Sequence, residues 1–278
     1  MQKMRTAIPL KINLIQADQL SLTEIRLNHG AMFDFSISPN DKKWLNVHYP
    51  NLKIYKGNNG DIEIAGVLNF SMTYQEGKSY VINPAPDYAE GIRIQDGYQI
   101  KIEYKASEFS DLPQVFETGS RIAKIVQNRN LKPEDLHINP SGAVCLCIKP
   151  EETGNLPAGF NIADFFNNLV VPFFYAQSYF EQYNSWPWGQ YSHGDLGFIE
   201  WYLQQKEATS QSVVIFLERL KKYNSWQNLK QLLELKHNVK GHHLCICGKG
   251  EKFRKCHSGV LKGVWKLKKD IKRFNIEL

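Results

Sequence analysis

The sequence of 278 residues contains no long hydrophobic run and no set of cysteines suited to a disulfide framework. Its longest apolar stretch, around residues 168–176, falls far short of the roughly 20 residues that a membrane span requires. The first ten residues hold only a short apolar patch, which argues against a secretory signal peptide. The five cysteines form two tight groups, whereas a secreted framework would spread an even number along the chain. We therefore expect a cytoplasmic protein with no membrane partner.

Acidic residues are scarce at the carboxyl end. From Lys236 onward, twelve Lys and Arg stand against three acids, a balance of +9, although the whole chain carries only +6. The preceding part holds 22 bases and 25 acids and is therefore near neutral. A charge block of this kind informs on partners rather than on fold. We expect a near-neutral body followed by a basic module.

Period-two alternation of apolar residues predicts strands in the first half of the chain, at 45–49, 52–55, 62–64, 67–70, 98–104 and 114–117. Helical periodicity follows at 161–183, with a kink or break expected at Pro172, and then at 196–206 and 210–235. The last stretch should split near residues 223–225, where Ser225 is suited to cap the second part. Strands followed by helices predict an α+β fold.

An irregular stretch at 137–148 contains the first cysteine pair. It begins His-Ile-Asn-Pro-Ser-Gly and continues Ala-Val-Cys-Leu-Cys-Ile, so a polar turn leads directly into Cys145 and Cys147. One interpretation is structural: the turn enters a buried strand, in which cysteines act as small hydrophobic residues. The other interpretation is catalytic, because an activated cysteine is a strong nucleophile. The residue types alone leave both open.

This stretch resembles the active-site segment of ubiquitin-conjugating enzymes, in which a His-Pro-Asn turn leads through a Gly to a Cys-Leu pair. The similarity extends over residues 15–205 and is sharpest at 113–148, which begins Pro-Gln-Val-Phe-Glu-Thr. The sequence differs from the family pattern at Ile138, which stands in place of the proline, and in a shorter turn. Residues 186–194 are similar to divergent bacterial relatives found in antiphage operons such as CBASS.

The resemblance implies an antiparallel meander sheet with flanking helices and a thioester on Cys145. It also implies that Asn139 positions the amine or stabilises the oxyanion, with His137 or His193 assisting. Cys147 matches no family position of known role. The implied partners are an activating enzyme and either a ubiquitin-like modifier or the carboxyl terminus of a nucleotide-cyclising enzyme. Exchange between thioesters of similar energy needs no strong base, so we expect no Asp or Glu pair to crowd Cys145.

Three thiols and one imidazole lie within thirteen residues in the basic module. A four-ligand set of the kind that binds zinc tetrahedrally is formed by Cys245, Cys247, Cys256 and His257. The order Cys-x-Cys-Gly-x-Gly, then Cys-His, also resembles the SEC-C motif, a zinc knuckle that binds partner proteins in its family. We expect one structural Zn²⁺ here, with His242 and His243 outside its coordination shell.

The segment 261–274 interleaves basic and apolar residues. One interpretation is an amphipathic terminal helix with lysines in solvent, packed through Leu261, Val264, Leu267 and Ile271. The other is an electrostatic docking surface for an acidic protein or a nucleic acid.

These features predict three parts: a ubiquitin-conjugating-like domain at 1–205, a helical connector at 206–240, and a SEC-C-like zinc knuckle with a basic tail at 241–278. The expected function is transfer of an acyl group through Cys145 to a target amine in antiphage defence. The carboxyl-terminal module is expected to recruit the target protein. Two alternatives remain: a catalytically inactive adaptor of the same fold, and a nucleic-acid-binding protein acting through the knuckle and tail. The thiol at Cys145 favours the transferase over the adaptor.

Overall fold

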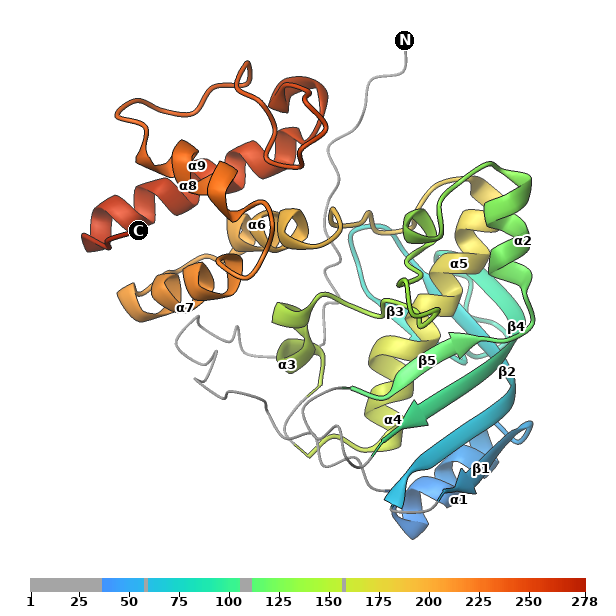
Figure 1. Cartoon of the computed structure of the whole chain (residues 1–278). Helices are drawn as coiled ribbons and strands as arrows, with labels where there is room; N and C mark the ends of the chain where they lie inside the picture. The colour runs from blue at the N-terminus through green and yellow to red at the C-terminus, as the bar shows by residue number, and fades with distance from the viewer. Residues whose placement is uncertain (1–36, 58–59, 106–111, 157–158) are drawn as a thin grey trace. The chain divides into compact units, whose positions relative to one another are not determined.

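The computed structural model describes residues 37–57, 60–105, 112–156 and 159–278 (Figure 1). Its contacts divide the chain into two compact units, one ending at Pro187 and the other running from Trp188 to Leu278. This division differs from the expected boundary at residue 205 and the separate connector. Helix α6 (Asp195–Gln204) belongs to the second unit because it packs along α9 (Ser258–Phe274).

The first unit is built on an antiparallel sheet of strand order β1-β2-β4-β5, with the short β3 paired to β2. The strands β1 to β5 are Leu52–Lys56, Ile62–Tyr74, Tyr80–Ile82, Ile92–Tyr104 and Gln114–Glu117. The register places Ile64 opposite Ile102, and Ile102 opposite Val115. The predicted strands at 62–64 and 67–70 are parts of the single strand β2. The predicted α+β class, with an antiparallel sheet and flanking helices, is confirmed.

Alternation along β4 turns one face of the sheet inward. Tyr98, Ile100 and Ile102 lie on that face, and each is at most 2% exposed. Helix α5 (Val171–Tyr183) packs on β4 and β2, and the ring of Phe174 lies 4.8 Å from the ring of Tyr98. Each such buried side chain contributes roughly 1.5–3 kcal/mol to folding. The core of the first unit therefore lies between its sheet and α5.

Residues 45–49 do not form the predicted strand. Residues 45–48 form the last part of a helix, α1 (Pro39–His48), and Tyr49 is the residue that follows it. The hydroxyl of Ser38 accepts a hydrogen bond from the Asp41 N–H at 3.1 Å, and the Asp41 carboxylate accepts one from the Ser38 N–H at 2.9 Å. This reciprocal capping box satisfies two N–H groups at the helix start. The strand prediction failed because apolar alternation over five residues also fits the last turn of an amphipathic helix.

A long helix follows the expected pattern at 161–183 without ending at the proline. It runs through α4 (Ile162–Phe165), a π-helical turn (Phe166–Val170) and α5. Pro172 lies in the first turn of α5, directly after the π-helical turn. That turn changes the hydrogen-bonding pattern at the place where proline lacks an N–H. The helix therefore continues past Pro172.

Three further helices complete the comparison with the sequence. Helix α2 (Arg121–Asn128), with Ile122 and Ile125 buried, was not predicted. Helices α7 (Ser210–Leu220) and α8 (Trp226–Glu234) confirm the split near residues 223–225. Ser225 precedes α8, but its side chain makes no capping hydrogen bond, so its expected role is not observed.

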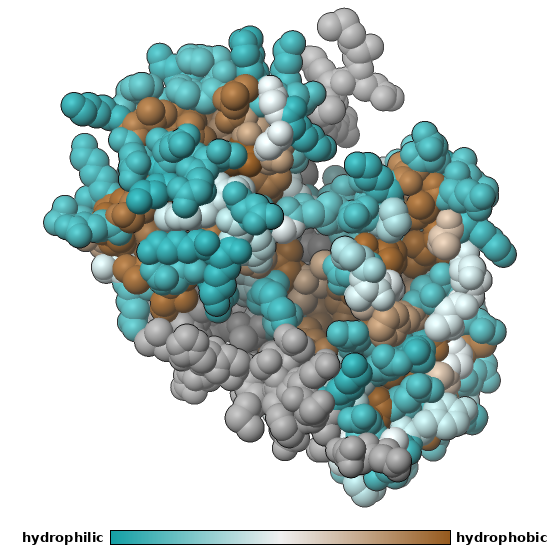
Figure 2. All heavy atoms as spheres, in the orientation of Figure 1, coloured by the Kyte–Doolittle hydropathy of each residue, from teal (hydrophilic) through white to brown (hydrophobic). Residues whose placement is uncertain are grey.

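The core of the second unit is the packing of α6 against α9. A Cβ atom on Gly263 would collide with the backbone of Ile199, so glycine permits the close approach of these helices. The buried Tyr202 hydroxyl donates to the Asp270 carboxylate at 2.7 Å. On α9, Lys268 caps the end of α8 by donating to the carbonyls of Leu232, Leu233 and Leu235. Hydrophilic side chains cover much of the face of this unit that Figure 2 shows.

Candidate functional site

A tight antiparallel turn carries the first cysteine pair beside β5. The main-chain N–H of Cys145 donates to the carbonyl of His137 at 2.7 Å, and Asn139 pairs across the turn through a bond of 2.8 Å. The Val144 N–H donates to the carbonyl of Val115 in β5, also at 2.7 Å. The sequence thus brings His137, Asn139 and Cys145 into one backbone unit attached to the sheet.

Helix α5 anchors the start of this turn through Gln177. The Gln177 side chain is 1% exposed, and its amide donates to the carbonyl of Leu136 at 2.9 Å. Its buried carbonyl oxygen has no hydrogen-bond partner in the part of the chain that the structure describes. At the tip of the turn, Gly142 adopts a φ of +85°, which glycine reaches without strain. The thiol is therefore presented from a turn held at both ends.

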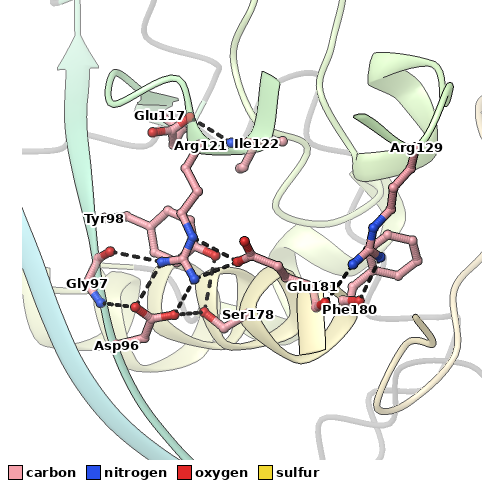
Figure 3. Close-up of polar contacts among 10 residues, drawn as sticks. All are labelled: Asp96, Gly97, Tyr98, Glu117, Arg121, Ile122, Arg129, Ser178, Phe180 and Glu181. Carbon is pink, nitrogen blue, oxygen red and sulfur yellow. Dashed lines mark hydrogen bonds and ion pairs between the residues drawn. The ribbon is translucent and has the colours of Figure 1, made fainter. Parts of the chain in front are cut away.

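Two arginines tie the α2 region to β4 and α5 (Figure 3). Arg121 bridges Asp96 on β4 and Glu181 on α5, with N···O distances of 2.7 and 2.6 Å. Burial alone would raise the pKa of Asp96, but hydrogen bonds from Arg121 and Ser178 hold that pKa below its usual value. Arg129, directly after α2, donates to the main-chain carbonyl of Glu181 at 2.6 Å. These contacts fix the point from which the chain enters the turn.

The His137 side chain takes part in an aromatic cluster. Its ring meets the Trp186 ring edge-on at 4.9 Å, and Trp186 stacks on Phe180 at 4.8 Å. His137 is half-buried and adopts a left-handed φ of +59°. The backbone carbonyl of His137 accepts from Cys145, while its ring packs against Trp186, in the chain beyond α5.

Cys145 is half-buried, and its Sγ lies 3.7 Å from the Cys147 carbonyl oxygen. Burial raises the pKa of the Cys145 thiol, and the negative charge of Glu152 raises it further. Burial raises the pKa of Cys147 well above its usual value, with Glu152 and Glu151 adding to the effect. Both thiols are therefore mostly protonated at neutral pH, since an unperturbed cysteine already has a pKa of about 8.5.

Glu152 is the acidic neighbour of Cys145 that the sequence did not reveal. After the cysteine pair, a 3-10 turn (Lys149–Glu151) leads into α3 (Glu152–Asn155), and this folds the chain back on itself. The Glu152 side chain is 13% exposed and pairs with Lys149 at 3.2 Å. Pro150 could have indicated this helical turn in the sequence, because proline favours the first turn of a helix.

Two further residues were expected to assist the Cys145 thiol, Asn139 and His193. Asn139 is exposed on the turn that carries Cys145. His193 is exposed and belongs to the second unit, beyond α5.

The second cysteine cluster forms a compact four-ligand group. The ligand atoms of Cys245, Cys247, Cys256 and His257 all lie within 4.8 Å of one another. His257 Nδ1 is 3.4 Å from Cys245 Sγ and 3.1 Å from Cys256 Sγ, and the Sγ atoms of Cys247 and Cys256 are 3.5 Å apart. Around a tetrahedral zinc, with bonds of about 2.0–2.3 Å, ligand atoms lie about 3.5–3.8 Å apart. The group is close to the size that a metal ion requires.

A small hairpin and two helical turns bring these ligands together. The Cys245 N–H donates to the Glu251 carbonyl at 2.7 Å, and Gly248 and Gly250 take positive φ values between the two. Cys256 ends a 3-10 turn (Phe253–Lys255), and His257 precedes α9. Burial lowers the pKa of His257, and nearby Lys249 lowers it further. The imidazole is thereby kept in the neutral form that binds metals.

The two histidines before this hairpin lie outside the four-ligand group. His242 stacks on His243 with ring centroids 4.7 Å apart, and His243 Nδ1 contacts the main chain of Lys240. Both imidazole rings are therefore packed against neighbouring groups of the chain.

No family model, curated protein or solved structure matches this chain. Among the described residues, no helix combines the length and the apolar character needed to cross a lipid bilayer.

Proposed function

We propose that this chain is a ubiquitin-conjugating-like cysteine acyltransferase with Cys145 as its nucleophile. In the first step, the Cys145 thiol attacks the thioester held by an activating enzyme, and the thiol of that enzyme leaves. In the second step, a target amine attacks the new thioester, an amide forms, and the Cys145 thiol is released. Both steps conserve atoms and require no redox partner.

The observation that carries this proposal is the presentation of Cys145. Cys145 is half-buried on a short turn that is hydrogen-bonded to β5 through Val144 and to α5 through Leu136. A nucleophile on a preorganised backbone needs little reordering to reach the tetrahedral transition state. The antiparallel sheet of order β1-β2-β4-β5, with this turn after β5 and a helix over the sheet, supports the meander with flanking helices that the resemblance implies.

Two further residues of the turn receive roles in the proposal. Asn139 is exposed and carries an amide that can donate to an oxyanion formed at the thioester. His137 acts by holding the turn, because its carbonyl accepts from Cys145 and its ring packs on Trp186. Cys147, whose pKa is raised by burial, is given no direct part in the reaction.

For the second unit we propose that one Zn²⁺ is held by the three thiolates and His257. A closed thiolate-rich shell leaves no open position for catalysis, so the metal would stabilise the hairpin. The unit would recruit a target protein, while the first unit meets an activating enzyme and a modifier. That modifier would be a ubiquitin-like protein or the carboxyl terminus of a nucleotide-cyclising enzyme, in an antiphage setting.

The test is thioester formation by the full-length protein with ATP, an activating enzyme and a ubiquitin-like modifier. We expect an adduct that a thiol reductant removes, that Cys145→Ala abolishes and that Cys147→Ala keeps. An adduct that survives Cys145→Ala and is lost in Cys147→Ala would contradict the assignment. A protein that never forms an adduct, yet binds the same partners, would be the inactive adaptor instead.

A further inference from the structure

Most cations at the carboxyl end of the chain are not used by the fold. Two of the twelve bind internal oxygen atoms: Lys266 pairs with Asp270 at 3.0 Å, and Lys268 caps α8. Arg273 is not one of these two, although its guanidinium lies 4.9 Å from the centre of the Phe274 ring. The other ten are exposed and form no ion pair with any residue that the structure describes. They are Lys236, Lys240, Lys249, Lys252, Arg254, Lys255, Lys262, Lys269, Lys272 and Arg273. This surplus positive charge is available to a partner.

Helix α9 arranges its share of these cations along one face. Lys262, Lys269 and Arg273 are spaced at i, i+7 and i+11, so they line up along the axis over about 16 Å. Trp265, which is 43% exposed, lies on the same side at i+3. The opposite side is buried through Val260, Leu261, Val264 and Leu267. The cations therefore face away from the core of the unit.

Two hydrogen bonds join this stripe to cations of the knuckle. The Trp265 indole N–H donates to the Val239 carbonyl at 2.5 Å, which sets Lys240 alongside α9. The Arg254 N–H donates to the Gly241 carbonyl at 3.0 Å, which sets Arg254 beside Lys240. We define the basic face as Lys240, Arg254, Lys262, Lys269 and Arg273.

Few acids oppose the basic face. From residue 236 onward, Glu251 and Glu277 are exposed, and Asp270 is buried against Tyr202 and Lys266. We propose that the basic face binds the phosphate backbone of nucleic acid without regard to base sequence. This inference goes beyond the proposed transferase activity and does not depend on Cys145.

The composition of the surface favours phosphate over an acidic protein. Eight of the ten exposed cations are lysines, and lysine is depleted in the buried centre of protein–protein interfaces. Protein–nucleic acid interfaces are much more positively charged, and lysine contacts phosphate as a compact point charge. A line of cations is also complementary to a nucleic acid, because the negative phosphates repeat along its backbone.

The experiment measures the binding of the full-length, zinc-loaded protein to fluorescein-labelled RNA and duplex DNA by fluorescence anisotropy. Both probes have mixed sequence and about 20 nucleotides per strand, and salt is varied between about 50 and 200 mM. For either probe, the logarithm of the association constant should fall linearly with the logarithm of the salt concentration. For five phosphate contacts the slope should be about −3.5 with the single strand and about −4.5 with the duplex.

Charge reversal on α9 should remove three of these contacts. We expect Lys262→Glu, Lys269→Glu and Arg273→Glu together to weaken binding at least about tenfold and to make the single-strand slope shallower by about 2. A matched control reverses Lys42, Lys43 and Lys56, which are exposed cations of the first unit. The control changes net charge equally and should leave affinity within about twofold. If the α9 variant loses zinc or helicity, Lys240→Ala with Arg254→Ala provides the same comparison.

Three results would overturn the proposal. One is the absence of binding to both probes at the lowest salt concentration. The second is equal weakening by the first-unit control, which would mean that net charge alone attracts the probe. The third is displacement of RNA by an equal concentration of poly-glutamate of the same length, which would assign the basic face to an acidic protein. The Cys145→Ala variant should bind like the wild type, so failure of the transferase proposal leaves this test unaffected.

Discussion

The main-chain N–H of Cys145 donates a hydrogen bond of 2.7 Å to the carbonyl oxygen of His137. This bond closes the turn that carries the thiol, and the His137 ring meanwhile packs edge-on against Trp186 at 4.9 Å. The residue that pairs with Cys145 across the turn is thus also held by an aromatic contact. The His137 ring can therefore help to hold the turn without transferring a proton.

This relationship predicts how two substitutions of His137 differ. His137→Phe keeps an aromatic ring against Trp186 and should form the Cys145 thioester at a rate close to the wild type. His137→Ala removes the ring, loosens the turn and should slow thioester formation several-fold. The measurement is single-turnover charging followed on non-reducing gels. Equal, severe loss in both variants would show that the imidazole itself acts in the chemistry.

The raised pKa of Cys145 predicts the pH dependence of its reactivity. Because only the thiolate is nucleophilic, the rate of alkylation by iodoacetamide should still be rising with pH between pH 7 and pH 9, and at each pH it should be slower than that of an unhindered free thiol. Glu152→Gln removes a negative charge that raises this pKa, so its profile should shift to lower pH. Mass spectrometry of the peptide containing Cys145 gives the rate.

Cys147→Ala serves as the background for this measurement and removes the competing thiol. A plateau below pH 8 in that background would mean that the Cys145 thiolate is stabilised, contrary to its burial beside Glu152. An unchanged profile in Glu152→Gln would mean that burial alone sets the pKa.

The four-ligand group predicts one equivalent of zinc per chain. Metal analysis of freshly purified protein should find it, and Cys256→Ser should lose it, because removal of one of four ligands leaves the shell open. Cys147→Ser is the matched control, since it removes a thiol of the first unit and should keep the metal. Less than half an equivalent in the wild type, or equal loss in both variants, would contradict a zinc site.

The bridge of Arg121 between Asp96 and Glu181 predicts a pH-dependent loss of stability. Arg121→Met leaves two carboxylates facing each other and should lower the free energy of unfolding by about 2 kcal/mol at pH 7. The folded-state pKa of Asp96 is lowered, so this stabilisation is present above its unfolded value, about 3.9, and is lost as pH falls through the folded value. Urea unfolding should therefore show the two proteins converging in acid.

A double-mutant cycle with Glu181→Gln separates the bridge from its neighbours. If the ion pair between Arg121 and Glu181 carries the effect, Arg121→Met should lower the free energy of unfolding by less in the Glu181→Gln background than in the wild type. Identical costs in both backgrounds would assign the loss to the contacts that Glu181→Gln leaves in place, the ion pair with Asp96 and the packing of the guanidinium 4.5 Å from the centre of the Tyr98 ring.

Features that depend on neighbouring residues could be predicted from the sequence. The zinc-type ligands lie within thirteen residues, so local turns suffice to gather them, and the structure brings all four together. The strands β1, β4 and β5 follow from apolar alternation, and the break between α7 and α8 follows from residues 223–225. In each case the information and the structure it specifies occupy the same short segment.

Features that depend on distant contacts required the tertiary structure. Residues 45–49 fit a strand or a helix equally well, and the helix α1 is held by its packing on α4, where the Ile162 N–H donates to the Asp41 carboxylate at 3.1 Å. Helix α6 joined the second unit because Gly263 on α9, far along the chain, leaves room for Ile199.

The sequence by itself determined an α+β protein with a local Cys/His cluster and a basic end, because composition and short-range periodicity carry that information. Only the tertiary structure decided the surroundings of Cys145. The anchoring of its turn to β5 and α5, the Glu152 carboxylate nearby and the His137 ring on Trp186 all arise from chain segments that meet in space. Such contacts follow from the burial of apolar surface across the whole unit, which no short window of sequence contains.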